Sequence, residues 1–321
     1  MSTPASGPRD SVQKVDSSRE TVIHADAIVK VYGHTRALDG LDLEVRKGEV
    51  HAFLGPNGAG KTTTIRALLG LINLDGGNLT VFGLDPVRDA TEVHRRLAYV
   101  PGDVAVWPNL TGGETIDLLI RMRGADPHGP SSRRKEMIER FNLNPTKKGR
   151  AYSTGNRQKI ALIAALCSPT DLLLLDEPTT GLDPLMKQVF NEYLAELNSE
   201  GTTVLISSHI LSEVERLAET VTIIRDGMTI ETGAIEDLRH LSRTKIHATV
   251  TGPIPDLTRV RGAHDVVVDG TQIECSVDAT ELSSVLSALA QAGVQSLTSS
   301  PPTLEDLFLD VYRSDSPATD R

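Results

Sequence analysis

The chain has 321 residues, of which 39% are hydrophobic and 24% charged, so it can form two packed domains and is too apolar to be disordered throughout. Its formal net charge of −10 gives no basic surface for nucleic acid, and no apolar run approaches the ~20 residues of a membrane-spanning helix. The two cysteines, Cys167 and Cys275, lack metal-ligand spacing and are typical of small buried hydrophobes in a reducing compartment. We therefore expect a soluble, cytoplasmic chain that binds no nucleic acid.

The N-terminal segment changes character at about residue 20. Residues 1–20 contain Ser, Pro, Gly and charged residues without the apolar stretch of a secretory signal, and we expect a disordered tail. From Thr21 the pattern is strand-like, and Leu41, Leu43 and Val45 alternate with charged residues as in a half-buried strand. Tyr32 lies before that strand and could stack on a nucleotide base, or else be a core or edge-strand tyrosine.

Residues 55–62 fit the phosphate-loop pattern G-x-x-x-x-G-K-[ST]. They follow a buried strand expected at 50–54 and precede a helix expected at 63–71, which is the context the motif requires. Glycines at 55, 58 and 60 let backbone N–H groups surround a polyphosphate. Lys61 can reach the β- and γ-phosphates, and the Thr62 hydroxyl can bind Mg²⁺. The segment therefore predicts a nucleoside triphosphate site.

A mostly helical region is expected between about residues 86 and 170. Thr111 and Glu114 have the spacing of a capping box, and further helices are predicted at 132–141 and 158–166. Ser153 and Gly155 precede the last of these helices. A hydroxyl and backbone N–H groups at that position can meet an anion, although a plain N-cap gives the same pattern.

Four leucines at 172–175 are followed by Asp176 and Glu177, which predicts a buried strand that ends in two carboxylates. In a phosphate-loop enzyme an acidic residue at such a strand end holds Mg²⁺, and Glu177 beside it can polarise the attacking water. A turn at 178–184 leads to a helix expected at about 185–199. The next buried strand, at 203–206, runs into His209, at the sheet edge where parallel sheets bind ligands.

The segment from about residue 243 predicts a small α+β appendage without a catalytic set. Alternating apolar residues predict strands around 246–250 and 273–277, with Asp269 and Gly270 in a hairpin turn. A helix is expected at 281–292, and an apolar helical stripe runs through 304–311.

Together these segments resemble the nucleotide-binding subunit of an ABC transporter over about residues 21–240. The resemblance implies an α/β fold: a P-loop NTPase core with an N-terminal antiparallel β subdomain, an inserted helical subdomain at about 86–170 and the C-terminal accessory domain at 241–321. It also implies ATP and Mg²⁺ as cofactors. The implied catalytic residues are Glu177 and His209, and the implied metal ligands are Thr62 and Asp176. The implied nucleotide-binding residues are Tyr32, Gly55, Pro56, Asn57, Gly58, Ala59, Gly60, Lys61, Thr62, Thr63, Ser153, Gly155, Asn156 and Asp183.

Two of the family's motifs differ in this sequence. The signature Leu-Ser-Gly-Gly-Gln is matched with Thr154 in place of its first glycine and Asn156 in place of its glutamine. The retained Ser153 and Gly155 are expected to meet ATP held by a second subunit, and Asp183 to touch that subunit. The glutamine that senses Mg²⁺ in the family is replaced by Gly102, which leaves open whether the neighbouring Asp103 substitutes for it.

The whole arrangement, together with residues 107–111 and 304–308, resembles the ATPase subunits of antibiotic and multidrug exporters. It implies a head-to-tail homodimer, or a heterodimer with another ATPase, on the inner face of the cell membrane. The dimer would drive a separately encoded integral membrane permease, with Trp107 either near the permease or in the core. Two alternatives are a soluble ABC-type ATPase that acts on nucleic acid or ribosomes, which the acidic charge opposes, and a weakly hydrolysing nucleotide-binding regulator. Gly102 and Thr154 favour the regulator, whereas Glu177 and His209 oppose it.

Overall fold

The computed structural model describes residues 19–210, 214–240 and 243–300, so all but the last two residues of the tail expected at 1–20, and the apolar stripe at 304–311, lie outside the described residues. Contacts divide the chain into two units between Gly233 and Ala234, a few residues before the boundary expected at 240. The difference corresponds to a short helix, α8 (Ile235–His240), which falls in the second unit. None of the helices in these described ranges is long and apolar enough to cross a membrane.

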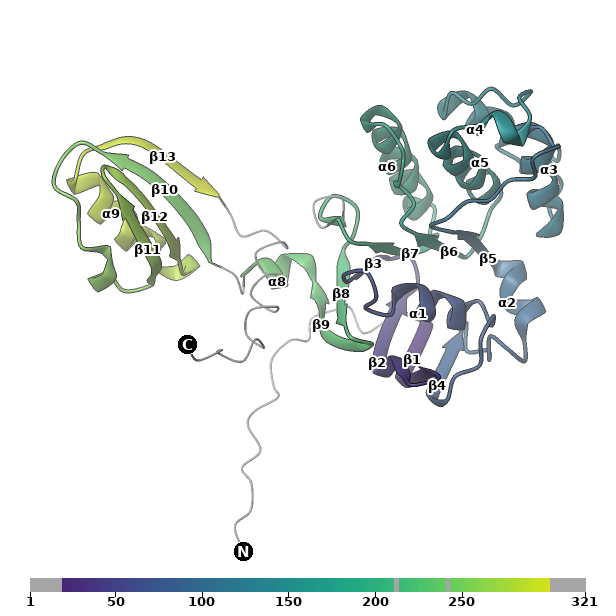
Figure 1. Cartoon of the computed structure of the whole chain (residues 1–321), viewed down its shortest axis with the longest axis horizontal. Coiled ribbons are helices and arrows are strands. Elements are labelled where there is room, and N and C mark those ends of the chain that lie inside the picture. Colours follow the sequence, from purple (N-terminus) through teal and green to yellow (C-terminus); the bar gives the residue numbers. More distant parts are fainter. Residues whose placement is uncertain (1–18, 211–213, 241–242, 301–321) are drawn as a thin grey trace, which may run out of the picture. The chain divides into compact units, whose positions relative to one another are not determined.

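A six-stranded sheet forms the centre of the first unit (Figure 1). Its strands lie in the order β5-β6-β7-β3-β8-β9. The first five strands in this order are parallel to one another. The middle strands are buried on both faces, because helices and the second sheet cover them, and this explains their unbroken apolar sequences. The strands are β3 (Val50–Leu54), β5 (Leu97–Val100), β6 (Leu172–Asp176), β7 (Thr203–Ser208), β8 (Thr220–Arg225) and β9 (Met228–Ala234).

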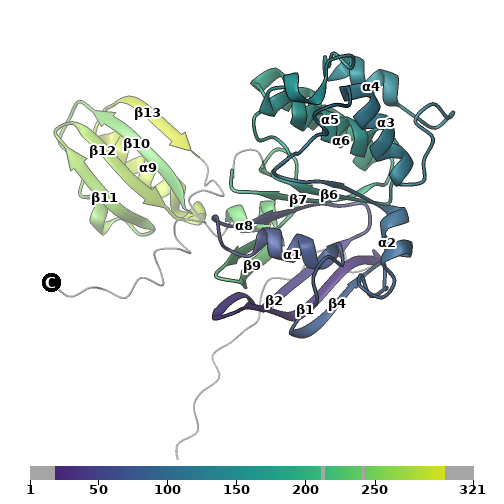
Figure 2. The ribbon, with the colours of Figure 1, turned by 45° about the vertical axis from the view of Figure 1, so that its right-hand side comes forward.

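A three-stranded antiparallel sheet packs beside the central one and is the N-terminal β subdomain that the family resemblance implies. Its order is β2-β1-β4, formed by β1 (Thr21–Tyr32), β2 (Thr35–Arg46) and β4 (Gly76–Val81). Helix α1 (Lys61–Leu68) lies between the two sheets in both views (Figures 1 and 2). Ile65 and Leu68 of α1 join one core with apolar residues of both sheets, so the phosphate loop is anchored at its two ends.

Helices α3 to α6 form a lobe on one side of the central sheet, whereas α2 lies apart from it and packs through Val93 into the core shared with the three-stranded sheet (Figure 2). The predicted capping box is confirmed, because the Thr111 hydroxyl accepts from the Glu114 N–H and the Glu114 carboxylate accepts from the Thr111 N–H. The region expected to be mostly helical also contains strand β5, which belongs to the central sheet. The helices are α2 (Ala90–Arg96), α3 (Gly112–Met122), α4 (Arg134–Arg140), the 3₁₀ turn Gly149–Ala151, α5 (Thr154–Leu166) and, after β6, α6 (Pro184–Ser199).

The second unit is an antiparallel sheet with one helix on its apolar face. The strand order is β11-β12-β10-β13, and the predicted hairpin joins Asp269 to Gln272 across β11 and β12. Ile246 and Cys275 pack with Val285 and Leu289 of α9 in its core, and both cysteines of the chain are buried and free. The elements are β10 (Thr244–Val250), β11 (Ala263–Asp269), β12 (Gln272–Val277), α9 (Leu282–Gln291) and β13 (Val294–Ser300), with 3₁₀ turns at Leu257–Arg259 and Ala279–Glu281.

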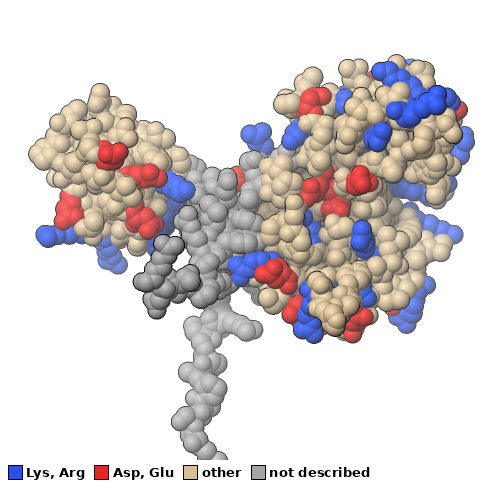
Figure 3. Space-filling view, viewed as in Figure 1, with Lys and Arg blue, Asp and Glu red and all other residues tan. Residues whose placement is uncertain are grey.

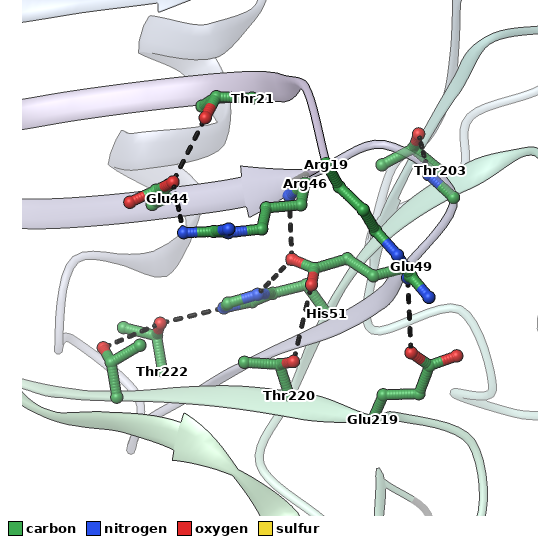
Figure 4. A network of polar contacts seen from close by, with 12 residues as sticks. Arg19, Thr21, Glu44, Arg46, Glu49, His51, Thr203, Glu219, Thr220 and Thr222 are labelled. Atoms are coloured by element: carbon green, nitrogen blue, oxygen red, sulfur yellow. Dashed lines mark hydrogen bonds and ion pairs between the residues drawn. The ribbon is translucent and has the colours of Figure 1, made fainter. Parts of the chain in front are cut away.

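A buried polar network supports the strand that leads into the phosphate loop (Figure 4). His51 of β3 is fully buried, with Nδ1 3.0 Å from Glu49 Oε1 and Nε2 2.8 Å from Thr222 Oγ1. An ionised carboxylate can only accept, so the Nδ1–H of His51 donates to Glu49, while Nε2 is hydrogen-bonded to the Thr222 hydroxyl. The Thr222 hydroxyl in turn lies 3.0 Å from that of Thr232, so the buried imidazole is fully hydrogen-bonded.

The Glu49 carboxylate makes the free energy of unfolding depend on pH. Burial by itself would raise its pKa, but the hydrogen bond and attraction of His51 and the Arg46 N–H outweigh burial and leave the pKa below its ordinary 4.5. A lowered carboxylate pKa stabilises the fold above the unfolded-state value, and this contribution disappears as pH falls through the folded-state value. We expect Glu49→Gln to reduce the free energy of unfolding at pH 7 by about 1–3 kcal/mol. The difference should shrink below pH ~4, as measured by urea unfolding.

Candidate nucleotide-binding and catalytic site

The phosphate loop connects β3 to α1 and leaves the start of the helix open to an anion. Gly60 is the N-cap of α1 with φ 112°, a conformation that favours glycine, and no side chain caps the helix. A Cβ at Gly60 would lie 2.9 Å from Leu38 Cδ2, so the loop packs closely on β2. Asn57 and Gly58 are exposed, Pro56 and Thr63 are half-buried, and Gly55 and Ala59 are buried. Unpaired helix N–H groups next to exposed loop backbone fit a bound phosphate chain.

Lys61 places a buried ammonium group in this loop. Its side chain is 6% exposed, and Nζ donates to the carbonyl oxygens of Gly55 at 2.6 Å and Pro56 at 3.1 Å. Burial lowers the pKa of Lys61, although the carboxylates of Glu177 and Asp176 oppose this shift. The Glu177 carboxylate is 4.0 Å away. A buried ammonium group without water around it is stabilised when an anion binds next to it. Lys61 is therefore suited to the phosphate-binding role predicted for it.

Asp176 lies at the end of β6 between two hydroxyl groups. Its Oδ2 accepts from Thr62 Oγ1 at 3.3 Å, and its Oδ1 accepts from Ser207 Oγ at 2.5 Å. A hydroxyl and a carboxylate oxygen are the hard ligands that Mg²⁺ takes together with water and phosphate oxygens, so Thr62 and Asp176 fit this ion. In the described part of the chain no cluster of three or more His, Cys, Asp or Glu residues forms a metal cage of its own.

Glu177 and His209 form a pair at the same sheet edge. His209 Nδ1 lies 2.9 Å from Glu177 Oε1. Glu177 has the left-handed φ of 47°, which is uncommon for a residue with a side chain, and its N–H donates to the carbonyl oxygen and hydroxyl of Ser207. The bend turns the chain out of β6 immediately after Asp176. Two neighbouring carboxylates therefore have different partners, and the Glu177 side chain stays partly exposed.

The aromatic candidate, Tyr32, ends strand β1 and is 45% exposed. The core alternative is therefore wrong. The Lys30 ammonium lies 5.4 Å from the centre of its ring. Tyr32 pairs with Thr35 in a hairpin whose second strand packs against Gly60, so an exposed ring is available on the hairpin next to the phosphate loop.

The signature residues lie at the start of α5. Ser153 is its N-cap and accepts from the Asn156 N–H at 3.4 Å, so the helix begins at Thr154, earlier than the predicted 158. A Cβ at Gly155 would lie 2.3 Å from the carbonyl oxygen of Gly181, so only glycine fits there. Gly181 belongs to the turn before α6, and Asp183 in that turn is the N-cap of α6, accepting from the Met186 N–H at 2.9 Å.

Two further predicted positions lie on the segment after β5. Gly102 packs against Asp176, and a Cβ there would be 3.3 Å from the Asp176 carbonyl oxygen. Asp103 is exposed, and no hydrogen bond joins it to the other described site residues. Trp107 is 44% exposed, which excludes the core alternative.

Ser207 is a site residue that the sequence did not predict. It stands directly opposite Asp176 in the parallel pairing of β6 and β7 and bonds both Asp176 and Glu177. The only signal in the sequence was its position at a strand end, two residues before His209.

Comparison with known proteins gives the family. The family model "ABC transporter" matches residues 38–180, and "ATP-binding protein DrrA1-3-like, C-terminal domain" matches 233–312. The daunorubicin resistance ATP-binding protein DrrA3 of Streptomyces coeruleorubidus is 34% identical over 307 residues, which cover 92% of this chain and 97% of the relative. The chain belongs to the ATP-binding proteins of ABC transporters. The linearmycin resistance ATP-binding protein LnrL of Bacillus subtilis is also similar to this ABC protein, at 33% identity over 90% of the chain and 98% of the relative.

Solved structures agree with the family and with the predicted fold. An ATP-binding subunit of an ABC transporter is 28% identical, with a TM-score of 0.62 over 69% of this chain and 93% of that one. A dimeric bacterial ABC transporter cassette has a TM-score of 0.59 over 66% of this chain and 98% of that one, at 23% identity, and shows the fold alone. This ABC protein is thus an α/β P-loop ATPase that binds and hydrolyses ATP as the subunit of a transporter. ABC proteins of this kind dimerise and work with a membrane permease.

Proposed function

We propose that the chain hydrolyses ATP at composite sites of a head-to-tail homodimer and thereby drives a separately encoded permease that exports antibiotic-like molecules. One observation carries the catalytic part: the phosphate-loop lysine, the strand-end carboxylates and His209 converge at one sheet edge. The transport part is supported by full-length similarity to antibiotic resistance proteins, which includes both units of the chain.

Each residue of the site has a role that follows from its contacts. Lys61 would bind the β- and γ-phosphates, because its buried ammonium now has only neutral acceptors within hydrogen-bond distance. Glu177 would accept a proton from the attacking water. The His209 Nδ1–H holds the Glu177 carboxylate in place, and His209 would donate from Nε2 to the terminal phosphate when both ring nitrogens carry a proton. Mg²⁺ on Thr62 and Asp176 would neutralise charge on the phosphate oxygens.

The second subunit would complete each ATP site. Ser153 is exposed at the start of α5. Because Gly155 packs closely on Gly181, the start of α5 and the turn that contains Asp183 lie side by side and can face the second subunit together. An N-cap serine next to a helix N-terminus can bind the terminal phosphate of ATP held by the other subunit. Tyr32 would stack on the adenine of the chain's own ATP.

The permease would dock in an apolar groove between the central sheet and the helical lobe. The groove encloses about 410 Å³, and Leu69, Tyr99, Leu119 and Met122 contribute to its wall. Met122 is 71% exposed, a large value for an apolar side chain, and an exposed apolar groove of this kind suits a helix of a partner protein. A dimer bound in this way would be held on the inner face of the cell membrane.

The proposal is tested by co-expression with a candidate permease, sought as a neighbouring reading frame that encodes several apolar segments of about 20 residues. We expect the two proteins to co-purify in detergent, and we expect cells that carry both to accumulate less of a fluorescent drug such as daunorubicin than cells with Lys61→Ala. Absence of a complex, together with ATPase stimulation by RNA or ribosomes, would instead favour the soluble alternative.

Basic and acidic side chains are interspersed on the face drawn in Figure 3, with basic groups over the outer end of the helical lobe.

A further inference from the structure

Arg123 is a charged residue in the apolar groove that has no counter-charge. It follows the last residue of α3 as its C-cap. Its Nη1 donates to the carbonyl oxygen of Ala165 at 3.1 Å, whereas its Nε is buried without a hydrogen-bond partner. Among the described residues it forms no ion pair. Burial lowers the pKa of the Arg123 guanidinium, which the thiol of Cys167 only partly opposes. A partly buried guanidinium with an unpaired Nε and one neutral acceptor is an unfavourable arrangement for a protein on its own.

The groove contains nothing that could neutralise this charge. No Asp or Glu is among its lining residues, and Arg123 is the only Lys or Arg there. The other polar side chains are Tyr99 and His94, and His94 Nε2 already contacts the carbonyl oxygen of Leu69 at 2.9 Å. The C-terminal ends of α3 and α5 lie beside Arg123 and supply partial negative charge, but not a full counter-ion.

We infer that the permease segment that occupies this groove carries an Asp or Glu within an apolar helical face, and that this carboxylate pairs with Arg123. The inference rests on the proposed docking of the permease. A docked helix would cover the groove and exclude water, so the apolar contacts supply adhesion and the single charge pair fixes position and orientation. Arg123 is therefore a specificity-determining residue: permeases with an uncharged or basic group at that point would be rejected.

The test measures the dissociation constant between the purified ATPase and the neighbouring-frame permease in detergent. Arg123→Met removes the charge and keeps most of the volume, and we expect the dissociation constant to rise roughly 30-fold or more. Arg121→Met, an exposed residue two positions earlier on α3 and outside the groove, is the matched control and should bind like the wild type. Basal ATPase activity and thermal unfolding of the isolated variants should stay close to wild type.

Substitutions on the permease side leave the ATPase intact and test the pair directly. Changing each Asp or Glu of the permease's cytoplasmic loops to Asn or Gln should identify one position that weakens wild-type binding but has no further effect with Arg123→Met. Exchanging the charges, with Arg123→Glu and that position changed to Arg, should restore binding.

Leu119→Gln distinguishes docking in the groove from the charge pair with Arg123, because it disturbs the apolar wall and leaves the charge of Arg123 unchanged. Weaker binding with Leu119→Gln but wild-type affinity with Arg123→Met would overturn the charge pair and leave docking in the groove intact. Wild-type affinity with both variants would overturn docking in this groove. If both variants lose binding, but no Asp or Glu substitution in the permease weakens wild-type binding without further effect on Arg123→Met, the inferred pair would be overturned.

Discussion

Replacing Glu177 with glutamine is expected to reduce ATP turnover by about 10²- to 10⁴-fold, because the amide keeps the shape of the carboxylate but cannot accept a proton from water. ATP binding should persist, since the Lys61 ammonium and the phosphate loop are unchanged. The variant should therefore form a dimer that depends on ATP, detected as an earlier peak in size-exclusion chromatography. Steady-state phosphate release measures the turnover.

Glu139→Gln is the matched control for this experiment. Glu139 is an exposed glutamate on α4 whose side chain forms no hydrogen bond or ion pair with the other described residues. It should turn over ATP at the wild-type rate and remain monomeric or dimeric as the wild type does. Wild-type activity in Glu177→Gln would refute the assignment of Glu177 as the base.

Replacing Lys61 with methionine is expected to abolish stabilisation by ATP. At one hundred times its dissociation constant, a ligand stabilises the folded state by about 2.7 kcal/mol, and this shift should appear in thermal unfolding of the wild type. Methionine removes a buried charge while keeping most of the length of the side chain, so the variant without ATP should be at least as stable as the wild type. Loss of the ATP-induced shift therefore reports binding rather than damage to the fold.

Lys135→Met, at an exposed lysine of α4, is the control for the change in composition and should respond to ATP like the wild type. An unchanged ATP-induced shift in Lys61→Met would mean that the ammonium does not bind the phosphates. In that case the loop backbone and helix α1 would carry nucleotide binding alone.

Local patterns predicted much of the fold. The phosphate loop, the capping box of Thr111 and the hairpin at Asp269 depend on residues close in sequence, so spacing alone indicates them. Burial of the leucine strand followed from its composition. Helix α5 starts earlier than expected because Ser153 caps it, and the periodicity of apolar residues does not report a polar first turn.

Contacts between distant segments could not be predicted in this way. The bond from Ser207 to Asp176 joins residues 31 apart, and it requires the register of β6 against β7. The left-handed bend at Glu177 likewise depends on Ser207, since Glu177 itself does not favour that conformation. Arg123 gave no signal in the sequence, because its missing partner is visible only once α3 and α5 are packed together.

The contact of Gly155 with Gly181 has a consequence for how two ATP molecules are used. Gln158 Nε2 also donates to the carbonyl oxygen of Pro178 at 3.0 Å, so the start of α5 and the turn after Glu177 are fastened at two points. In the proposed dimer, Glu177 serves the chain's own ATP and Ser153 serves its neighbour's. A shift of the turn at one site would therefore move the phosphate-binding group of the other. The two active sites would act as one cooperative unit, with hydrolysis at each conditioned by occupancy of both.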